Sequence, residues 1–222
     1  MEFQQVVQRR RMVRAFQKDR PVPPQVVRRI LENALRAPSA GHTQGWAFLV
    51  LQGPEETGQF WNALFPQKRR TRFAYPGLFD APLIIVPLAS QSAYVERYAE
   101  NDKGWTDRDE SRWPVPFWHI DTGFAAMLML LTAVDEQLGA LFFGIFDVEA
   151  FRTAFGVGEQ HTPIGAIAIG YPLPDRRSPS LARGRRSLEE CVHWGTWSQP
   201  PPAPASADSG FPQDESDHIK FP

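Results

Sequence analysis

Two groups of arginines stand near opposite ends of this 222-residue chain. The groups are Arg9, Arg10, Arg11 and Arg14, and then Arg176, Arg177, Arg183, Arg185 and Arg186. A planar guanidinium donates paired hydrogen bonds that match the oxygens of a phosphate. One arginine cluster is usually a solvated surface, but two clusters could converge on one phosphate if the chain ends meet in space. The spacing is therefore compatible with a phosphate-bearing ligand but does not establish one.

A stretch of small residues is the second candidate for chemistry. Residues 37–50 read APSAGHTQGWAFLV. Pro38 closes the preceding helix because its ring disfavours the helical conformation one residue earlier. Ser39, Ala40 and Gly41 have little bulk, so a backbone or a flat ligand could approach closely there. The same pattern is also that of an ordinary connection between a helix and a buried strand, which we predict over residues 46–51.

Other common kinds of site have weak support in the sequence. The histidines are scattered, and His119 and Asp121, which have ligand-like spacing, would point in different directions on a helix. Ser39 does not lie in a GxSxG elbow, and the glycines of GVGEQH follow a helix and lack the third Rossmann glycine. These patterns argue against a metal site, a serine hydrolase and a dinucleotide fold.

Composition limits the environment and the partners of the chain. The formal net charge of −1 gives no general attraction for nucleic acid or an anionic membrane, and 42% hydrophobic residues suffice for a core. Cys191 is the single cysteine, which fits a reducing compartment. The N-terminus lacks a signal-peptide core, and the longest apolar run, residues 124–131, is too short to span a bilayer. We therefore expect a soluble, cytoplasmic protein.

Apolar periodicity predicts alternating helices and strands. Helices are predicted over residues 2–11, 24–35, 54–65, 118–138 and 148–155, and strands over 46–51, 82–88 and 164–171. Residues 141–146 are predicted as a strand or an extended loop broken by Gly144. Leu35 is expected on the apolar stripe of the second helix, and Gly139 is expected to end the fourth. Residues 82–88 are predicted as a short buried strand, and Pro87 argues against a central position along its whole length.

Three segments carry no such periodicity. Residues 67–80 are predicted as a loop or ragged helix, and residues 94–116 as an excursion that is either a lid or a solvated loop. Residues 198–222 are rich in proline and small residues and are predicted to form a disordered tail or extended arm after one domain over residues 1–197.

With these segments assembled, the chain resembles the FMN-dependent nitroreductase family over residues 6–197. Five segments match in order: RRMVRAF (10–16), APSAGHTQGW (37–46), LGALFFGI (138–145), IGAIAIGYP (164–172) and RGRRSL (183–188). The resemblance implies an α+β fold in which helices flank a mostly antiparallel sheet. It also implies an intertwined homodimer with two FMN sites, each lined by both subunits.

The resemblance assigns the arginines to the flavin. Arg10 would serve the phosphate side and Arg14 the N1/O2 edge of the isoalloxazine, where a cation stabilises the reduced flavin. Arg183 and Arg185 would be late phosphate ligands. Met12 stands where the family usually has serine, so a hydroxyl contact is lost, and Arg11 or backbone groups could compensate.

The small-residue turn and the third motif would contact the flavin ring. Pro38, Ser39 and Ala40 would line the ring from the other subunit, with His42 and Gln44 in the same turn. His42 replaces the usual asparagine, and Gly45 replaces the usual proline. Backbone N–H groups of Phe143 and Gly144 would face N5, and no side chain is assigned as a certain catalytic group.

The implied activity is an NADH- or NADPH-dependent flavin oxidoreductase with a ping-pong mechanism and a nitroaromatic, quinone or enone as acceptor. Alternatives within the fold are reductive dehalogenation, flavin breakdown and a deazaflavin donor. A non-catalytic binder of phosphate ligands or nucleic acid, contacting phosphates through residues 9–14, is the alternative from another class.

Overall fold

The computed structural model describes residues 1–197, which fall into two compact units divided between Arg176 and Arg177. Met1–Arg176 contains the sheet and nearly all the helices. The proposed tail, residues 198–222, lies outside the described residues, so the predicted domain boundary stays a prediction.

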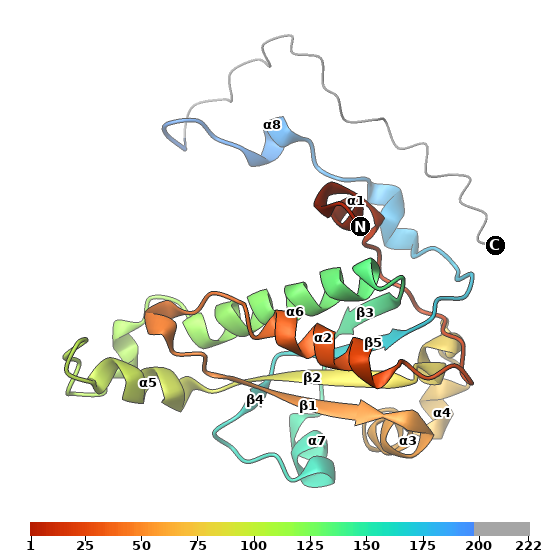
Figure 1. Cartoon of the computed structure of the whole chain (residues 1–222), viewed down its shortest axis with the longest axis horizontal. Coiled ribbons are helices and arrows are strands. Elements are labelled where there is room, and N and C mark those ends of the chain that lie inside the picture. The colour runs from red at the N-terminus through yellow and green to blue at the C-terminus, as the bar shows by residue number, and fades with distance from the viewer. Residues whose placement is uncertain (198–222) are drawn as a thin grey trace. The chain divides into compact units, whose positions relative to one another are not determined.

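The first unit is built on a five-stranded antiparallel sheet with the order β1-β2-β5-β3, in which β4 pairs with β2 (Figure 1). The strands are β1 (Trp46–Gln52), β2 (Leu83–Ala89), β3 (Gly139–Phe143), β4 (Thr162–Pro163) and β5 (Ala166–Gly170). The register places Phe48 opposite Pro87, Ile84 opposite Ala168, and Leu141 opposite Ala168. The predicted α+β architecture with a mostly antiparallel sheet is confirmed.

Helices cover both faces of this sheet, with α2 and α6 on one face and α3 and α7 on the other (Figure 1). The α-helices of the unit are α1 (Phe3–Arg9), α2 (Pro24–Ala34), α3 (Gly53–Leu64), α4 (Gln67–Arg70), α5 (Gln91–Ala99), α6 (Phe117–Asp135) and α7 (Val148–Phe155). Its 3-10 helices are η1 (Ala40–His42), η2 (Pro76–Asp80) and η3 (Glu110–Arg112). The second unit contains η4 (Pro179–Arg183) and α8 (Leu188–Cys191).

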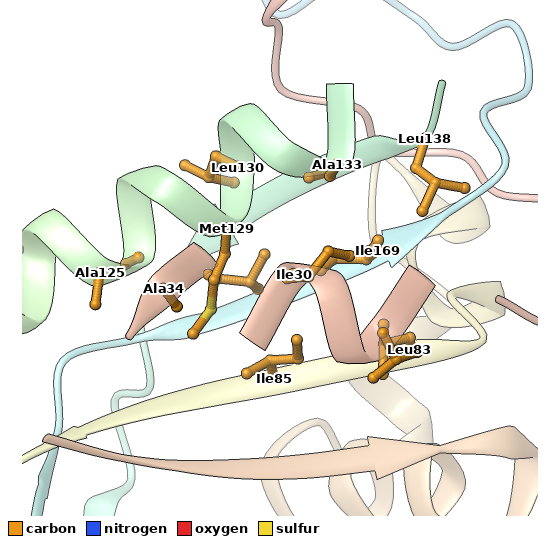
Figure 2. Packing of buried hydrophobic residues seen from close by; sticks show 14 of the residues in the cluster. Ile30, Ala34, Leu83, Ile85, Ala125, Met129, Leu130, Ala133, Leu138 and Ile169 are labelled. Atoms are coloured by element: carbon orange, nitrogen blue, oxygen red, sulfur yellow. The ribbon is translucent and has the colours of Figure 1, made fainter. Parts of the chain in front are cut away.

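Aliphatic side chains fill the space between α2, α6 and the sheet. Figure 2 shows Ile30 and Met129 lying between the two helices and Ile85 of β2. Ala34 and Ala125 are fully buried, and their short side chains let the helix backbones approach closely. By length and composition α6 could cross a bilayer, but it packs here as the core helix of the domain.

The other face of the sheet is aromatic. Phe60 and Trp61 of α3 are fully buried, and the Trp61 ring stacks on Phe143 with 5.5 Å between centroids and 18° between planes. Phe151 of α7 adds an edge-on contact to Phe60. These rings pack against the end of β3, where the motif over residues 138–145 leaves the sheet.

β2 is completely buried as predicted, and it is central, contrary to the expectation from Pro87. Pro87 falls between the β5 pairing, which involves residues 83–85, and the β4 pairing, which involves residues 88–89. Its carbonyl accepts the Ile164 N–H at 3.1 Å on that same edge, so its missing N–H removes no ladder bond.

Several element ends also differ from the prediction. α6 stops at Asp135, and Gln137, with φ of 60°, makes the left-handed turn that was expected at Gly139. Gly139 instead begins β3, where a Cβ would lie 2.8 Å from a methyl of Val13. Leu35 is 52% exposed because α2 ends before it. β1 is half-buried rather than buried because it is an edge strand.

Candidate functional site

The small-residue turn over residues 39–44 has a compact and strained backbone. Gly41, His42 and Gln44 have left-handed φ values of 62°, 54° and 52°. The Gln44 N–H donates to Ser39 Oγ at 3.0 Å, and Thr43 Oγ1 donates to the Ala40 carbonyl at 2.6 Å. Because non-glycine residues rarely adopt this conformation, the surrounding structure must hold it in place.

A buried carboxylate from α6 holds this turn. Asp121 is 3% exposed, and its Oδ2 accepts both the Ala40 N–H at 2.8 Å and the Tyr94 hydroxyl at 2.6 Å. Tyr94 lies on α5 and is fully buried. Burial is the main cause that raises the pKa of Tyr94, and the bond to Asp121 raises it further, so the phenol stays protonated as a donor.

Two tyrosine rings pack directly against glycines of the turn region. A Cβ on Gly45 would lie 2.5 Å from Tyr94, and a Cβ on Gly41 would lie 2.7 Å from Tyr98. A proline at position 45, as the resembling family has, would therefore overlap the Tyr94 ring. The presence of Gly45 is explained by this close approach.

The excursion over residues 94–116 begins as helix α5, so its first part is not a loop as predicted. Arg97 donates to the Gly41 carbonyl at 3.0 Å and to both Asp102 oxygens at 2.6 and 2.8 Å. Trp113 packs edge-on to Tyr98, with 4.4 Å between ring centroids. The rest of the excursion is therefore packed beside the turn.

The first arginine group lies on an extended segment that follows α1. The Val13 N–H donates to the Ala140 carbonyl of β3 at 2.9 Å, and the Gln17 N–H donates to the Tyr171 carbonyl just after β5 at 2.9 Å. Gly139 permits this approach because any side chain there would meet Val13. Backbone hydrogen bonds therefore fix residues 10–17 beside the strand that carries the third motif.

Asp175 holds the same segment through its side chain, which is 7% exposed. One oxygen accepts the Arg14 N–H at 2.7 Å, and the other pairs with the Arg11 guanidinium at 2.7 Å. The Arg14 guanidinium lies over the Tyr75 ring, 5.1 Å from its centroid. Arg10 is half-buried and has no carboxylate partner among residues 1–197, so its charge remains available to an anion.

The other predicted site residues lie where their motifs place them. His42 and Gln44 contact each other through their side chains at 3.1 Å and line an open surface depression with the end of α2. Phe143 is the last residue of β3, and Gly144 is exposed immediately after it. Pro38 is exposed at the start of the turn.

Arg183 and Arg185 belong to the second unit, which is described by itself. Arg183 is the last residue of η4, and Arg185 follows Gly184, whose φ is 70°. Both arginines are exposed. Their convergence with Arg10 on one phosphate stays a prediction.

The sequence reasoning missed the residues that hold the two segments. Asp121 was considered only as a poor metal partner of His119, yet its side chain binds the turn. A carboxylate placed before the long apolar run of helix α6 was the available signal for this role. Asp175 gave no such signal, because an aspartate in a polar loop is ordinary.

Two separate segments of the first unit offer features that suit a flat, anionic group, and the turn is the one expected to line the ring from the other subunit. The turn offers little side-chain bulk, Arg10 and Arg14 supply positive charge, and Gly144 leaves backbone exposed at the end of β3. FMN combines a planar ring with a phosphate, so these features fit it.

Known proteins have a similar fold, and one family model matches most of the chain. Residues 7–171 match the model of the Nitroreductase family. A protein of Thermus thermophilus named NADH dehydrogenase is 30% identical over 206 residues, covering 84% of this chain and 92% of that protein. The crystal structure of a nitroreductase family protein from Streptococcus pneumoniae gives a TM-score of 0.69 at 20% identity and covers 86% of this chain and 99% of its own. A Desulfovibrio desulfuricans protein solved in complex with FMN gives 0.62 at 24% identity and covers 91% and 99%.

Proposed function

This chain belongs to the nitroreductase family, and from that premise we propose that it is an FMN-dependent oxidoreductase that uses NADH or NADPH to reduce a small electron-poor acceptor. Nitroaromatics, quinones and enones are the acceptor class. The observation that carries the proposal is the family match over residues 7–171, which contains both the turn and the arginine segment. The names of the relatives support an oxidoreductase, and one structural neighbour was solved with FMN.

Several residues that would hold FMN lie on or beside strand β3, where backbone hydrogen bonds hold the chain. Arg10 would bind the phosphate side and Arg14 the N1/O2 edge, while the backbone of Phe143 and Gly144 would face N5. When bound, FMN supplies the N5 atom that accepts a hydride. The chain contributes a fixed cation near developing negative charge and an open face that donor and acceptor occupy in turn, which is a ping-pong scheme.

The small-residue turn would complete the site of a second subunit. The α1–α6 surface exposes a stripe of apolar side chains at helical spacing, comprising Phe3, Val7, Ile120, Phe124 and Met127. Exposures such as 46% for Phe124 leave apolar area that a second copy of the chain would cover. We therefore propose a homodimer that uses this stripe.

The first test is spectroscopic. Purified protein is expected to be yellow and to bleach on anaerobic addition of NADH or NADPH. Arg14→Ala should lower flavin retention or the rate of reduction, because it removes charge beside the ring. Arg28→Ala is the matched control, since Arg28 is a surface arginine that pairs with Glu32 on α2. A colourless protein that does not take up added FMN would refute the proposal, and salt-dependent nucleic-acid binding would then favour the binder.

The second test is the mass in solution. Phe124→Glu places a charge in the proposed interface and should halve the mass measured by light scattering, with loss of flavin. Leu173→Glu is the control, because Leu173 has a similar exposure of 41% but lies on neither α1 nor α6. A wild-type monomer that retains FMN would contradict the dimeric site.

A further inference from the structure

The buried carboxylate on α6 is not needed by the helix that carries it. The Asp121 side chain accepts hydrogen bonds from Ala40 in the turn and from Tyr94 on α5, both of which lie outside α6. Thr122 and Thr132, the other buried polar residues of α6, donate their hydroxyls to Trp118 and Leu128 of the same helix, and Thr132 also accepts a bond from Asn33 of α2. Burying a carboxylate is unfavourable without strong hydrogen-bond partners. The burial of Asp121 is therefore explained by its bonds to Ala40 and Tyr94.

Asp121 acts at the point where the turn begins its left-handed path. Ala40 opens η1 and immediately precedes Gly41, whose carbonyl is held from the other side by Arg97. The same carboxylate oxygen that accepts the Ala40 N–H also accepts the Tyr94 hydroxyl, and the Tyr94 ring packs against Gly45. One carboxylate oxygen therefore connects α6 to Ala40 near the start of the turn and to Tyr94 of α5, whose ring packs beside Gly45 just after the turn.

We propose that Asp121 is a positioning residue for the flavin site, holding the backbone of residues 39–44 in the shape that receives the flat ring. The inference rests on the proposed function and deepens it, because Asp121 lies behind the turn and acts through Ala40 and Tyr94. A turn of left-handed residues persists only where its surroundings hold it, so loss of this contact should release the surface that lines the ring.

Substitutions can separate hydrogen bonding from charge. Asp121→Ala removes both accepted bonds. Asp121→Asn keeps one carbonyl oxygen, which can accept from Ala40 and Tyr94 without a negative charge. Thr122→Val is the matched control, because Thr122 is the adjacent buried polar residue of α6 and its hydroxyl donates to the Trp118 carbonyl of its own helix.

The experiment measures FMN affinity of the purified apoprotein by quenching of flavin fluorescence, together with amide hydrogen exchange of residues 39–44 without flavin. We expect Asp121→Ala to raise the Kd by about tenfold, as loss of a hydrogen bond to a charged group would. Asp121→Asn should restore the Kd to within about threefold of wild type, and Thr122→Val should leave it unchanged. Exchange of the Ala40 amide should become faster in Asp121→Ala and stay slow in the control.

A second variant covers the case in which Asp121→Ala does not fold. Tyr94→Phe removes one hydroxyl and keeps the ring that packs on Gly45, so it should fold, exchange its Ala40 amide faster and weaken FMN binding about threefold. Wild-type affinity in both Asp121→Ala and Tyr94→Phe would overturn the inference. Failure of Asp121→Asn to rescue would also overturn it, in favour of an effect of charge.

The two proposals fail in distinguishable ways. If wild-type protein binds no FMN while Asp121→Ala exposes the Ala40 amide, the proposed function is wrong and the hold of Asp121 on the turn is supported. If wild-type protein binds FMN and Asp121→Ala leaves the exchange rate of the Ala40 amide unchanged, the function is supported and the positioning role is wrong.

Discussion

The turn over residues 39–44 and the arginine segment over residues 10–14 are each held by one carboxylate that accepts a backbone N–H. In the turn, Asp121 accepts from Ala40 and from the neutral hydroxyl of Tyr94. In the arginine segment, Asp175 accepts from Arg14 and from the charged guanidinium of Arg11. The two attachments therefore have similar geometry but different electrostatics.

The difference lies in what else supports each segment. The arginine segment also bonds to β3 through the backbone of Val13, and Gln17, three residues after the segment, bonds to Tyr171 after β5. The Arg11 side chain is 46% exposed. The turn lacks such strand pairing, and its carboxylate is 3% exposed. We infer that the turn depends mainly on side chains from other elements, of which Asp121 is the buried one and Arg97 the other hydrogen-bond partner. The arginine segment has backbone supports as well, and its ion pair is the weakest of them.

The largest expected effect is that of Asp121→Ala on stability. It leaves the Tyr94 hydroxyl and the Ala40 N–H without their acceptor, so the free energy of unfolding should fall by about 3 kcal/mol. Urea denaturation of the apoprotein measures this change. A loss no greater than that caused by Asp175→Ala would break the comparison.

Asp175→Ala should lower the free energy of unfolding by less, about 1.5 kcal/mol. The backbone bonds of residues 13 and 17 remain in this variant, and the Arg11 guanidinium can be solvated. The same denaturation experiment applies. The released Arg11 should not weaken FMN binding, since it adds free positive charge beside the proposed phosphate side. A loss of stability as large as that of Asp121→Ala would show that the strand pairing contributes little.

Tyr94→Phe should lower the free energy of unfolding by about 1 kcal/mol at neutral pH and should change how stability depends on pH in the alkaline range. The folded state raises the pKa of Tyr94 above its ordinary value of 10.0. Above that pH the unfolded chain therefore loses the phenol proton while the folded chain still keeps it. The stability contributed by the protonated phenol is therefore complete below that pH and declines as pH rises above it. Unfolding measured between about pH 8 and pH 11 should show a smaller alkaline loss in Tyr94→Phe than in wild type. Parallel profiles would contradict a protonated, buried donor.

The smallest effect is expected for Arg11→Ala, which removes only the half-exposed member of the Asp175 ion pair. The cost should be about 0.5 kcal/mol and should shrink as NaCl is raised to about 1 M, where screening is strong. Thermal unfolding at low and high salt measures it. The effect of Asp121→Ala should be nearly independent of salt, and a salt response of equal size in both variants would remove the distinction.

The sequence by itself determined most of the elements and the family. Helix α7 begins and ends as predicted, because Asp147 caps it by accepting the Ala150 N–H and Gly156 ends it at φ of 65°. The apolar residues of α2 and α6 are likewise visible in the sequence, and both helices supply side chains to the core. These are local signals, since each depends on residues within a few positions of one another.

Only the tertiary structure decided which carboxylates hold the turn and the arginine segment, and why Pro87 is tolerated in a central strand. Asp121 meets Ala40 across 81 positions of sequence, and Asp175 meets Arg14 across 161. Pro87 is harmless because two different strands pair on either side of it. Such contacts depend on how distant elements pack, and no spacing within one segment encodes them.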